Sequence, residues 1–172
     1  DFISPYAYLG WRSIHDLAER CGATVEPVPV LFAALLNAHG NKGPAEIPSK
    51  RIYIFKHTLR VAHDLGVPLA PPPTHPFNPL LALRVASLPR PAKERRRLID
   101  ALFDAVWAGG DGAETVAQVA DVLTRLDLDP EQELRAATQP ENKARLRTQT
   151  EAALAAGVFG VPTVLVGDEL FW

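Results

Sequence analysis

The tetrapeptide Ser4-Pro5-Tyr6-Ala7 places a hydroxyl group where a helix is expected to begin. Serine is a favoured residue at the cap before a helix, and proline is well tolerated at the first helical position. The unpaired N–H groups and the dipole at a helix start favour negative charge and lower the pKa of a thiol placed there. Ser4 could therefore donate a hydrogen bond to the thiolate of a bound ligand. The alternative is that Ser4 only caps the helix.

A second segment, Phe159-Gly160-Val161-Pro162-Thr163, places a proline directly before a short apolar run typical of a strand. A cis bond between Val161 and Pro162 would leave the backbone N–H and C=O of Val161 free to pair with an extended, peptide-like ligand. The alternative is an ordinary trans proline at a strand start. Together, the two segments resemble the active-site corners of the thioredoxin fold, with the usual Cys-x-x-Cys replaced by residues 4–7.

A polar segment over residues 40–53 brings basic residues to the start of another helix. Lys50 or Arg51 could neutralise a carboxylate, and Asn41 could orient it. The alternative is a solvated loop with both cations exposed. We expect Lys50 to face a cleft, or Arg51 if the helix start is shifted. This expectation rests on an apolar stripe that should pack inward, formed by Ile52, Phe55 and Leu59.

The rest of the pattern predicts a βαβ unit, a block of helices and a final strand pair. A helix that ends at Gly22 is followed by a predicted strand over residues 24–32, where Pro27 and Pro29 suggest an edge or a bulge. Strand, helix and strand in that order imply a parallel pair. Further helices are predicted at 52–66, 79–88, 92–108, 113–126, from the Asp129-Pro130 start signal, and at 140–156.

We therefore predict an α/β chain with a thioredoxin-like fold and an inserted all-helical domain. Residues 1–34 and 140–172 form the thioredoxin-like part, and residues 35–139 form the insertion. Both ends read as cut: Asp1-Phe2-Ile3 as the end of a strand, and Glu169 to Trp172 as part of a hairpin.

The composition narrows the classes of function. The 172 residues are 47% hydrophobic, enough for a sizeable core, and the net charge of −2 argues against a nucleic-acid-binding protein. No apolar run reaches the roughly 20 residues that cross a bilayer, so we expect no membrane partner. The single cysteine, Cys21, cannot form an internal disulfide, and we expect it to be buried. A cytoplasmic location is therefore expected.

In their order along the chain, these motifs resemble the 2-hydroxychromene-2-carboxylate isomerases and the kappa-class glutathione transferases. Both belong to the DsbA-like branch of the thioredoxin superfamily. The resemblance covers nearly the whole chain and rests on three segments, which are residues 2–9, the loop from Gly40-Asn41 to Lys50, and residues 159–172. It implies that glutathione binds with its thiol beside Ser4 and its backbone paired to Val161.

The resemblance also assigns further positions around glutathione. Pro5, Tyr6 and Pro162 belong to the same corner as Ser4, and the γ-glutamyl end is held near Trp172. Asn41 and Lys50 match positions that line the glutathione and substrate cleft. We also expect a homodimer that binds a small aromatic substrate.

The implied activity is isomerisation of an aromatic carboxylate by transient addition of the glutathione thiolate, with Ser4 tuning this borrowed nucleophile. One alternative is a kappa-like transferase that conjugates glutathione or reduces peroxides. Another is a non-catalytic thiol-binding protein that keeps the fold. Disulfide exchange is excluded, because that chemistry needs a second cysteine.

Overall fold

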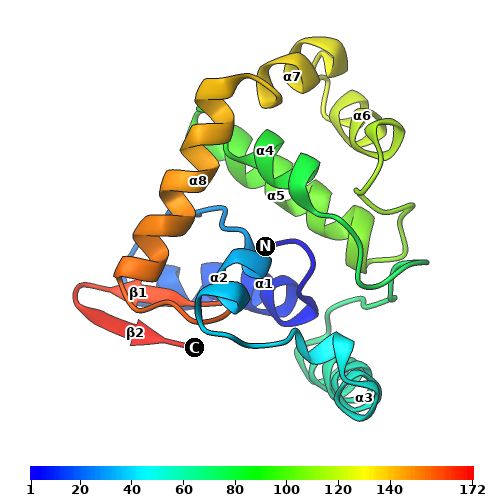
Figure 1. The fold of residues 1–172 in the computed structure, drawn as a ribbon. Coiled ribbons are helices and arrows are strands. Elements are labelled where there is room, and N and C mark those ends of the chain that lie inside the picture. The colour runs from blue at the N-terminus through cyan, green and yellow to red at the C-terminus, as the bar shows by residue number, and fades with distance from the viewer.

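Eight α-helices and one β-hairpin make up the chain, and the computed structural model describes all residues 1–172 (Figure 1). The helices are α1 (Pro5–Arg20), α2 (Phe32–Ala38), α3 (Pro48–Leu65), α4 (Leu80–Ala86), α5 (Ala92–Trp107), α6 (Val116–Arg125), α7 (Pro130–Ala137) and α8 (Pro140–Ala155). A 3₁₀ turn, η1 (Pro44–Glu46), precedes α3, and the hairpin consists of β1 (Val164–Val166) and β2 (Glu169–Phe171).

Local signals in the sequence define most helix ends. The Asp129 side chain accepts hydrogen bonds from the N–H groups of Glu131 and Gln132, so it caps α7 as the Asp-Pro pair indicates. Gly66 adopts the left-handed conformation (φ 64°) that ends α3. The helices predicted from residue 79 onward are all present, with ends displaced by at most a few residues.

The predicted strand over residues 24–32 is wrong. No backbone hydrogen bond involves residues 24–30, and Pro27 and Pro29 have no N–H group to offer a neighbouring strand. Val and Thr favour an extended backbone, but a strand also needs a partner for its N–H and C=O groups. Residues 1–3 form no strand either, so the expected parallel pair is absent. The short helix α2, which begins at Phe32, was not predicted.

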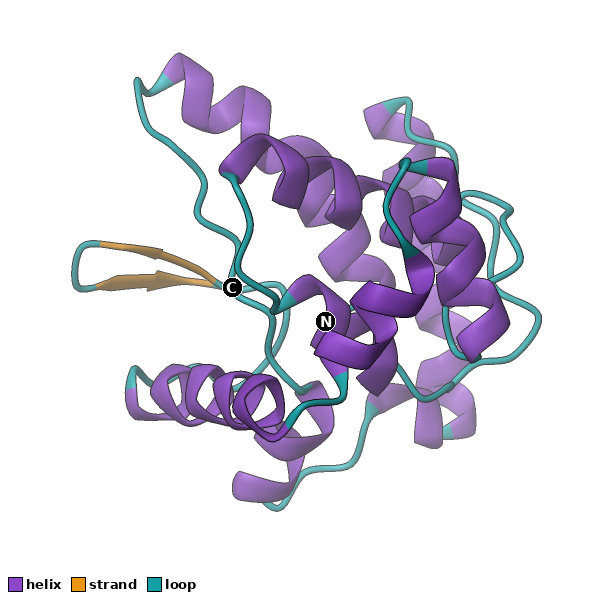
Figure 2. Cartoon of the chain, turned by 90° about the horizontal axis from the view of Figure 1, so that it is seen from above, coloured by secondary structure: helices purple, strands orange, loops and turns teal.

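Helix α1 packs into a continuous apolar core that it shares with helices α4, α5 and α6. Tyr8 and Leu9 of α1 are buried in the same cluster as Phe103 of α5 and Val122 of α6. Figure 1 shows α8 running from α7 down to the hairpin, so α8 connects the two ends of the fold. Figure 2 shows the hairpin extending away from the helices. In the hairpin, Val164 pairs with Phe171 and Val166 with Glu169.

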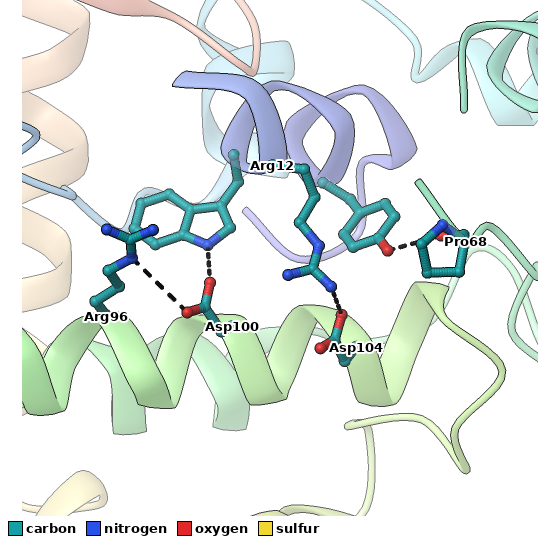
Figure 3. A network of polar contacts seen from close by, with 7 residues as sticks. Arg12, Pro68, Arg96, Asp100 and Asp104 are labelled. Carbon is teal, nitrogen blue, oxygen red and sulfur yellow. Dashed lines mark hydrogen bonds and ion pairs between the residues drawn. The ribbon is translucent and has the colours of Figure 1, made fainter. Parts of the chain in front are cut away.

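Polar contacts also fix α1 on α5 (Figure 3). The indole Nε1 of Trp11 donates to Asp100 at 2.6 Å, and the Arg12 guanidinium lies 2.8 Å from Asp104. The hydroxyl of Tyr8 donates to the carbonyl of Pro68 at 2.7 Å. Trp11 and Arg12 are adjacent on α1 and bind carboxylates four residues apart on α5, so these two contacts define how far along α5 the helix lies, whereas Tyr8 joins α1 to the segment after α3. No helix is both long and apolar enough to span a membrane.

Candidate functional site

Ser4 caps α1 and also faces the Val161–Pro162 turn. Its backbone is extended (φ −95°, ψ 119°), and its Oγ accepts the N–H of Ala7 at 3.2 Å. The same hydroxyl donates to the Val161 carbonyl, with 3.4 Å between the oxygens. Ser4 therefore caps α1, as the cap interpretation predicts, and its hydroxyl also lies at the Val161–Pro162 turn. Its role as a donor to a bound thiolate stays a prediction. The predicted cis bond between Val161 and Pro162 is confirmed.

Two glycines allow other groups to approach this corner closely. A methyl group on Gly10 of α1 would lie 3.0 Å from Cγ of Pro162, so the helix and the proline ring are in direct contact. A methyl group on Gly160 would lie 2.8 Å from Nε1 of Trp172. The Trp172 ring also lies 5.3 Å from that of Phe159. The C-terminal tryptophan thus lies beside the segment that leads into the cis-proline.

Side chains from distant parts of the sequence hold the backbone that leads into Ser4. The Trp107 indole donates to the Phe2 carbonyl at 2.8 Å, and Nε2 of His75 donates to the Ile3 carbonyl at 2.9 Å. The Asp1 carboxylate accepts from the N–H groups of Ile3 and Phe32. These contacts satisfy backbone groups that a neighbouring strand would otherwise pair. No sequence motif predicted this role for Trp107 or His75.

The environment of His75 keeps its ring neutral. A carbonyl only accepts hydrogen bonds, so Nε2 must carry the proton, and the buried Nδ1 has no partner. Burial lowers the pKa of His75, the bond to Ile3 opposes this shift, and the charge of Arg51 adds to it. The positive charge of Arg51 thus disfavours protonation of His75, whose ring donates to the Ile3 carbonyl.

Tyr6 contacts α3 through a second polar pair that the sequence did not reveal. Its hydroxyl lies 2.8 Å from Nδ1 of His57, and the Tyr53 ring stacks on the imidazole at 5.6 Å between centroids. Tyr6 and His57 are both half-buried. Burial raises the pKa of Tyr6, with a smaller contribution from Tyr53.

The corner also presents backbone donors without partners. The N–H groups of Tyr6 and Val161 donate to no other backbone group. The arrangement offers a helix start, a hydroxyl and an exposed backbone edge, which suit a thiolate attached to an extended peptide. No group of three or more His, Cys, Asp or Glu side chains is placed to hold a metal ion.

Comparisons with known proteins agree with this geometry. The DSBA-like thioredoxin domain matches the chain over residues 1–172. The chain belongs to this family. A solved 2-hydroxychromene-2-carboxylate isomerase superposes with a TM-score of 0.92 at 27% identity, covering 100% of this chain and 85% of that chain.

Relatives of this DSBA-like domain fall into two named groups. The 2-hydroxychromene-2-carboxylate isomerase of Pseudomonas putida is 28% identical over 175 residues, covering 100% of this chain and 85% of its own length. Glutathione S-transferase kappa 2 of Caenorhabditis elegans is 29% identical over 178 residues, covering 98% and 79%. The predicted thioredoxin-like fold class and both family resemblances are confirmed, and the relatives support an isomerase or a glutathione-related activity.

In this DSBA-like domain, Pro5 and Tyr6 follow Ser4 in the first turn of α1, and the other predicted site residues divide into two groups. Ser4, Val161 and Pro162 meet directly, and Trp172 lies beside them through Gly160. The second group consists of Asn41, Lys50 and Arg51. Their side chains are exposed and form no hydrogen bond or ion pair with Ser4, Val161 or Trp172. They remain proposed substrate contacts.

The expected inward stripe on α3 is wrong. Ile52 and Leu59 are 59% and 46% exposed, and the buried face of α3 is formed instead by Thr58 and Ala62, with Phe55 half-buried. Phe55 does pack toward the corner, 5.3 Å from the His75 ring. The expectation that Cys21 is buried is also wrong, because this thiol is exposed at the end of α1.

Proposed function

We propose that this protein is a glutathione-dependent isomerase of the 2-hydroxychromene-2-carboxylate type, acting on an aromatic carboxylate. The observation that carries the proposal is the position of the Ser4 hydroxyl. It is 8% exposed, begins α1 and lies 3.4 Å from the Val161 carbonyl at a cis-proline. The similarity to named isomerases over the full chain supports the same reaction.

The backbone of Val161 suits the binding of glutathione, because its N–H has no backbone partner and its C=O is held only by the 3.4 Å bond from Ser4. The Val161 N–H and C=O would pair with its peptide backbone, as an added strand pairs with a sheet edge. Pro5 and Pro162 would border the thiol, and the γ-glutamyl end would lie toward Trp172. Bound glutathione would supply the thiolate nucleophile that adds transiently to the substrate and leaves again.

Ser4 has one proton to donate and must redirect it when a thiolate arrives. In the free protein this proton lies toward the Val161 carbonyl, at the long distance of 3.4 Å. A turn about the Cα–Cβ or Cβ–Oγ bond would direct it to the thiolate, a stronger charge-assisted acceptor. The Tyr6 N–H at the start of α1 would add a second donor. Ser4 would thereby favour the ionised thiol without attacking carbon itself.

The substrate carboxylate would be neutralised by a cation at the start of α3. Lys50 and Arg51 both lie in its first turn, and Asn41 lies in the loop before it. Arg51 is the stronger candidate, because its charge already reaches His75 beside Ile3. Lys50 would then act from the outer side of the same turn.

The similarity to a kappa-class transferase favours a second candidate, in which glutathione is conjugated to a substrate or reduces a peroxide. A thiol-binding protein without turnover would share the same corner.

We also propose that the protein acts in the cytoplasm as a homodimer. Sedimentation velocity would measure the mass of the assembly.

Product analysis separates these functions. The protein is incubated with 2-hydroxychromene-2-carboxylate, with and without glutathione, and the products are resolved by chromatography. Isomerised substrate with glutathione recovered unchanged supports the isomerase, whereas a stable glutathione conjugate supports the transferase. Glutathione binding in calorimetry with neither product supports a binding protein. No isomerisation in the presence of glutathione refutes the proposed activity.

A further inference from the structure

Tyr6 and His57 join the first turn of α1 to α3 through a bond between two groups that can transfer protons. The Tyr6 hydroxyl and the His57 Nδ1 are 2.8 Å apart. Both residues are half-buried, so part of the pair is open to solvent. Tyr6 lies two positions beyond Ser4 on the same helix start.

We propose that Tyr6 and His57 form a proton relay that serves the substrate bound beside Ser4. This proposal rests on the proposed function, because it needs a reaction in which a substrate oxygen gains and loses negative charge. Tyr6 is the catalytic residue that contacts that oxygen, and His57 is the positioning residue and proton reservoir behind it.

The proton balance of the relay is closed within the reaction. When the glutathione sulfur forms its bond to carbon, the displaced electron pair moves onto a substrate oxygen. The relay requires that His57 carry a proton on both ring nitrogens at the start. Tyr6 then gives its hydroxyl proton to that oxygen and takes up the Nδ1 proton, which leaves His57 neutral. When the sulfur–carbon bond breaks, the oxygen returns a proton to Tyr6, and Tyr6 returns one to His57. No proton is consumed, and no oxidant or reductant is needed.

The surroundings of the pair fit both roles. The Tyr53 ring stacks on His57 with 12° between the planes, and an aromatic face stabilises a neighbouring cation. Burial raises the pKa of Tyr6, so its hydroxyl is protonated before the reaction and depends on His57 to replace the proton that it gives up. Tyr8, in contrast, is fully buried and directs its hydroxyl at the Pro68 carbonyl, which cannot exchange protons in this way.

This contrast supplies a matched control for the experiment. Tyr6→Phe, His57→Gln and the double variant are compared with Tyr8→Phe, which removes a hydroxyl of purely structural use from the same helix. For each protein we would measure kcat and KM for chromene carboxylate isomerisation, glutathione affinity by calorimetry and the melting temperature. The ¹⁵N resonance of His57 Nδ1 is recorded without glutathione, so one measurement does not depend on activity.

The relay predicts a loss of kcat without a loss of binding. Tyr6→Phe should lower kcat about 100-fold, a typical contribution of general acid–base catalysis, with KM and glutathione affinity unchanged. The double variant should be no slower than the slower single variant, because both changes break one relay. The Nδ1 resonance should shift in Tyr6→Phe and not in Tyr8→Phe, which should lose melting temperature but retain kcat.

Three results would overturn the relay while leaving the proposed function intact, provided that the unmodified protein isomerises the substrate. They are a normal kcat in Tyr6→Phe, a loss explained by weaker glutathione binding, and an Nδ1 resonance that Tyr6→Phe does not move. If the unmodified protein binds glutathione but isomerises nothing, the proposed function fails and the relay fails with it.

Discussion

Replacing Ser4 by alanine removes two hydrogen bonds at once, and their consequences can be separated. The Oγ accepts the Ala7 N–H at 3.2 Å, which caps α1. Loss of a serine cap costs about 1 kcal/mol of folding free energy. The hydroxyl also donates to the Val161 carbonyl at 3.4 Å, and we propose that Ser4 redirects this hydrogen bond to a bound thiolate while keeping its proton.

The expected shift in the thiol pKa follows from the exchange of one acceptor for another. A hydrogen bond to a charged group contributes about 1.5–3 kcal/mol, and a neutral bond about 0.5–1.5 kcal/mol. Because Ser4 gives up the neutral bond to Val161 when it turns to the thiolate, the net gain is about 1–1.5 kcal/mol. At 1.36 kcal/mol per pKa unit, Ser4→Ala should raise the pKa of the bound glutathione thiol by about one unit.

The assay is a titration of the thiolate absorbance of glutathione bound to each variant, with stability measured separately in urea. Thr115→Ala is the matched control, because the Thr115 hydroxyl caps α6 by accepting the Gln118 N–H at the same 3.2 Å. Thr115→Ala should lose about 1 kcal/mol of unfolding free energy. Ser4→Ala should lose that amount plus about 0.5–1.5 kcal/mol for the bond to Val161. Only Ser4→Ala should change the thiol pKa. An equal thiol pKa in Ser4→Ala and the unmodified protein would refute the role given to this hydroxyl.

Three further changes test the parts around Ser4. Gly10→Ala places a methyl group 3.0 Å from Cγ of Pro162, so the proline ring must shift. This shift should weaken glutathione binding in calorimetry, and an unchanged affinity would show that the contact is irrelevant to the site. Arg51→Ala should raise KM for the anionic substrate more than Lys50→Ala with little change in kcat, and the reverse order would favour Lys50. The pKa of His75 in the folded protein lies below its usual 6.5, so the unfolded chain binds a proton at a higher pH than the folded protein does. Unfolding free energy measured in urea should therefore fall as the pH drops below about 6.5, and His75→Gln should reduce that fall. An unchanged pH dependence in His75→Gln would exclude His75 as its source.

The helices and the Ser4 corner were predictable because their signals are local. A cap followed by proline, or a left-handed glycine after an apolar face, determines a helix end from a few neighbouring residues. The fold resemblance then related Ser4 to Val161, although 157 positions separate them. The sequence could therefore place the groups that would bind a thiol before any contact was known.

The predictions that failed depended on contacts with distant residues. On α3, the positions Ile52, Phe55 and Leu59 have the same spacing as Phe55, Thr58 and Ala62, so the spacing could not decide which set is buried. Residues 24–30 have suitable propensities for a strand but no backbone partner. The bond from Tyr6 to His57 leaves no pattern in sequence at all.

Helix α5 determines the position of Ser4 without reaching it. Its last residue, Trp107, holds the Phe2 carbonyl, while Asp100 and Asp104 hold Trp11 and Arg12 of α1. Contacts with α5 thus fix the chain both before Ser4, at Phe2, and after it, at Trp11 and Arg12. Gly10 has no side chain, so α1 can contact the Pro162 ring directly. A hydroxyl that must turn from a carbonyl to a thiolate gains from such a frame, because the bond it makes depends on distances of a few tenths of an ångström. Helix α5 would therefore contribute to the proposed thiol site by positioning it, even where none of its side chains would contact glutathione.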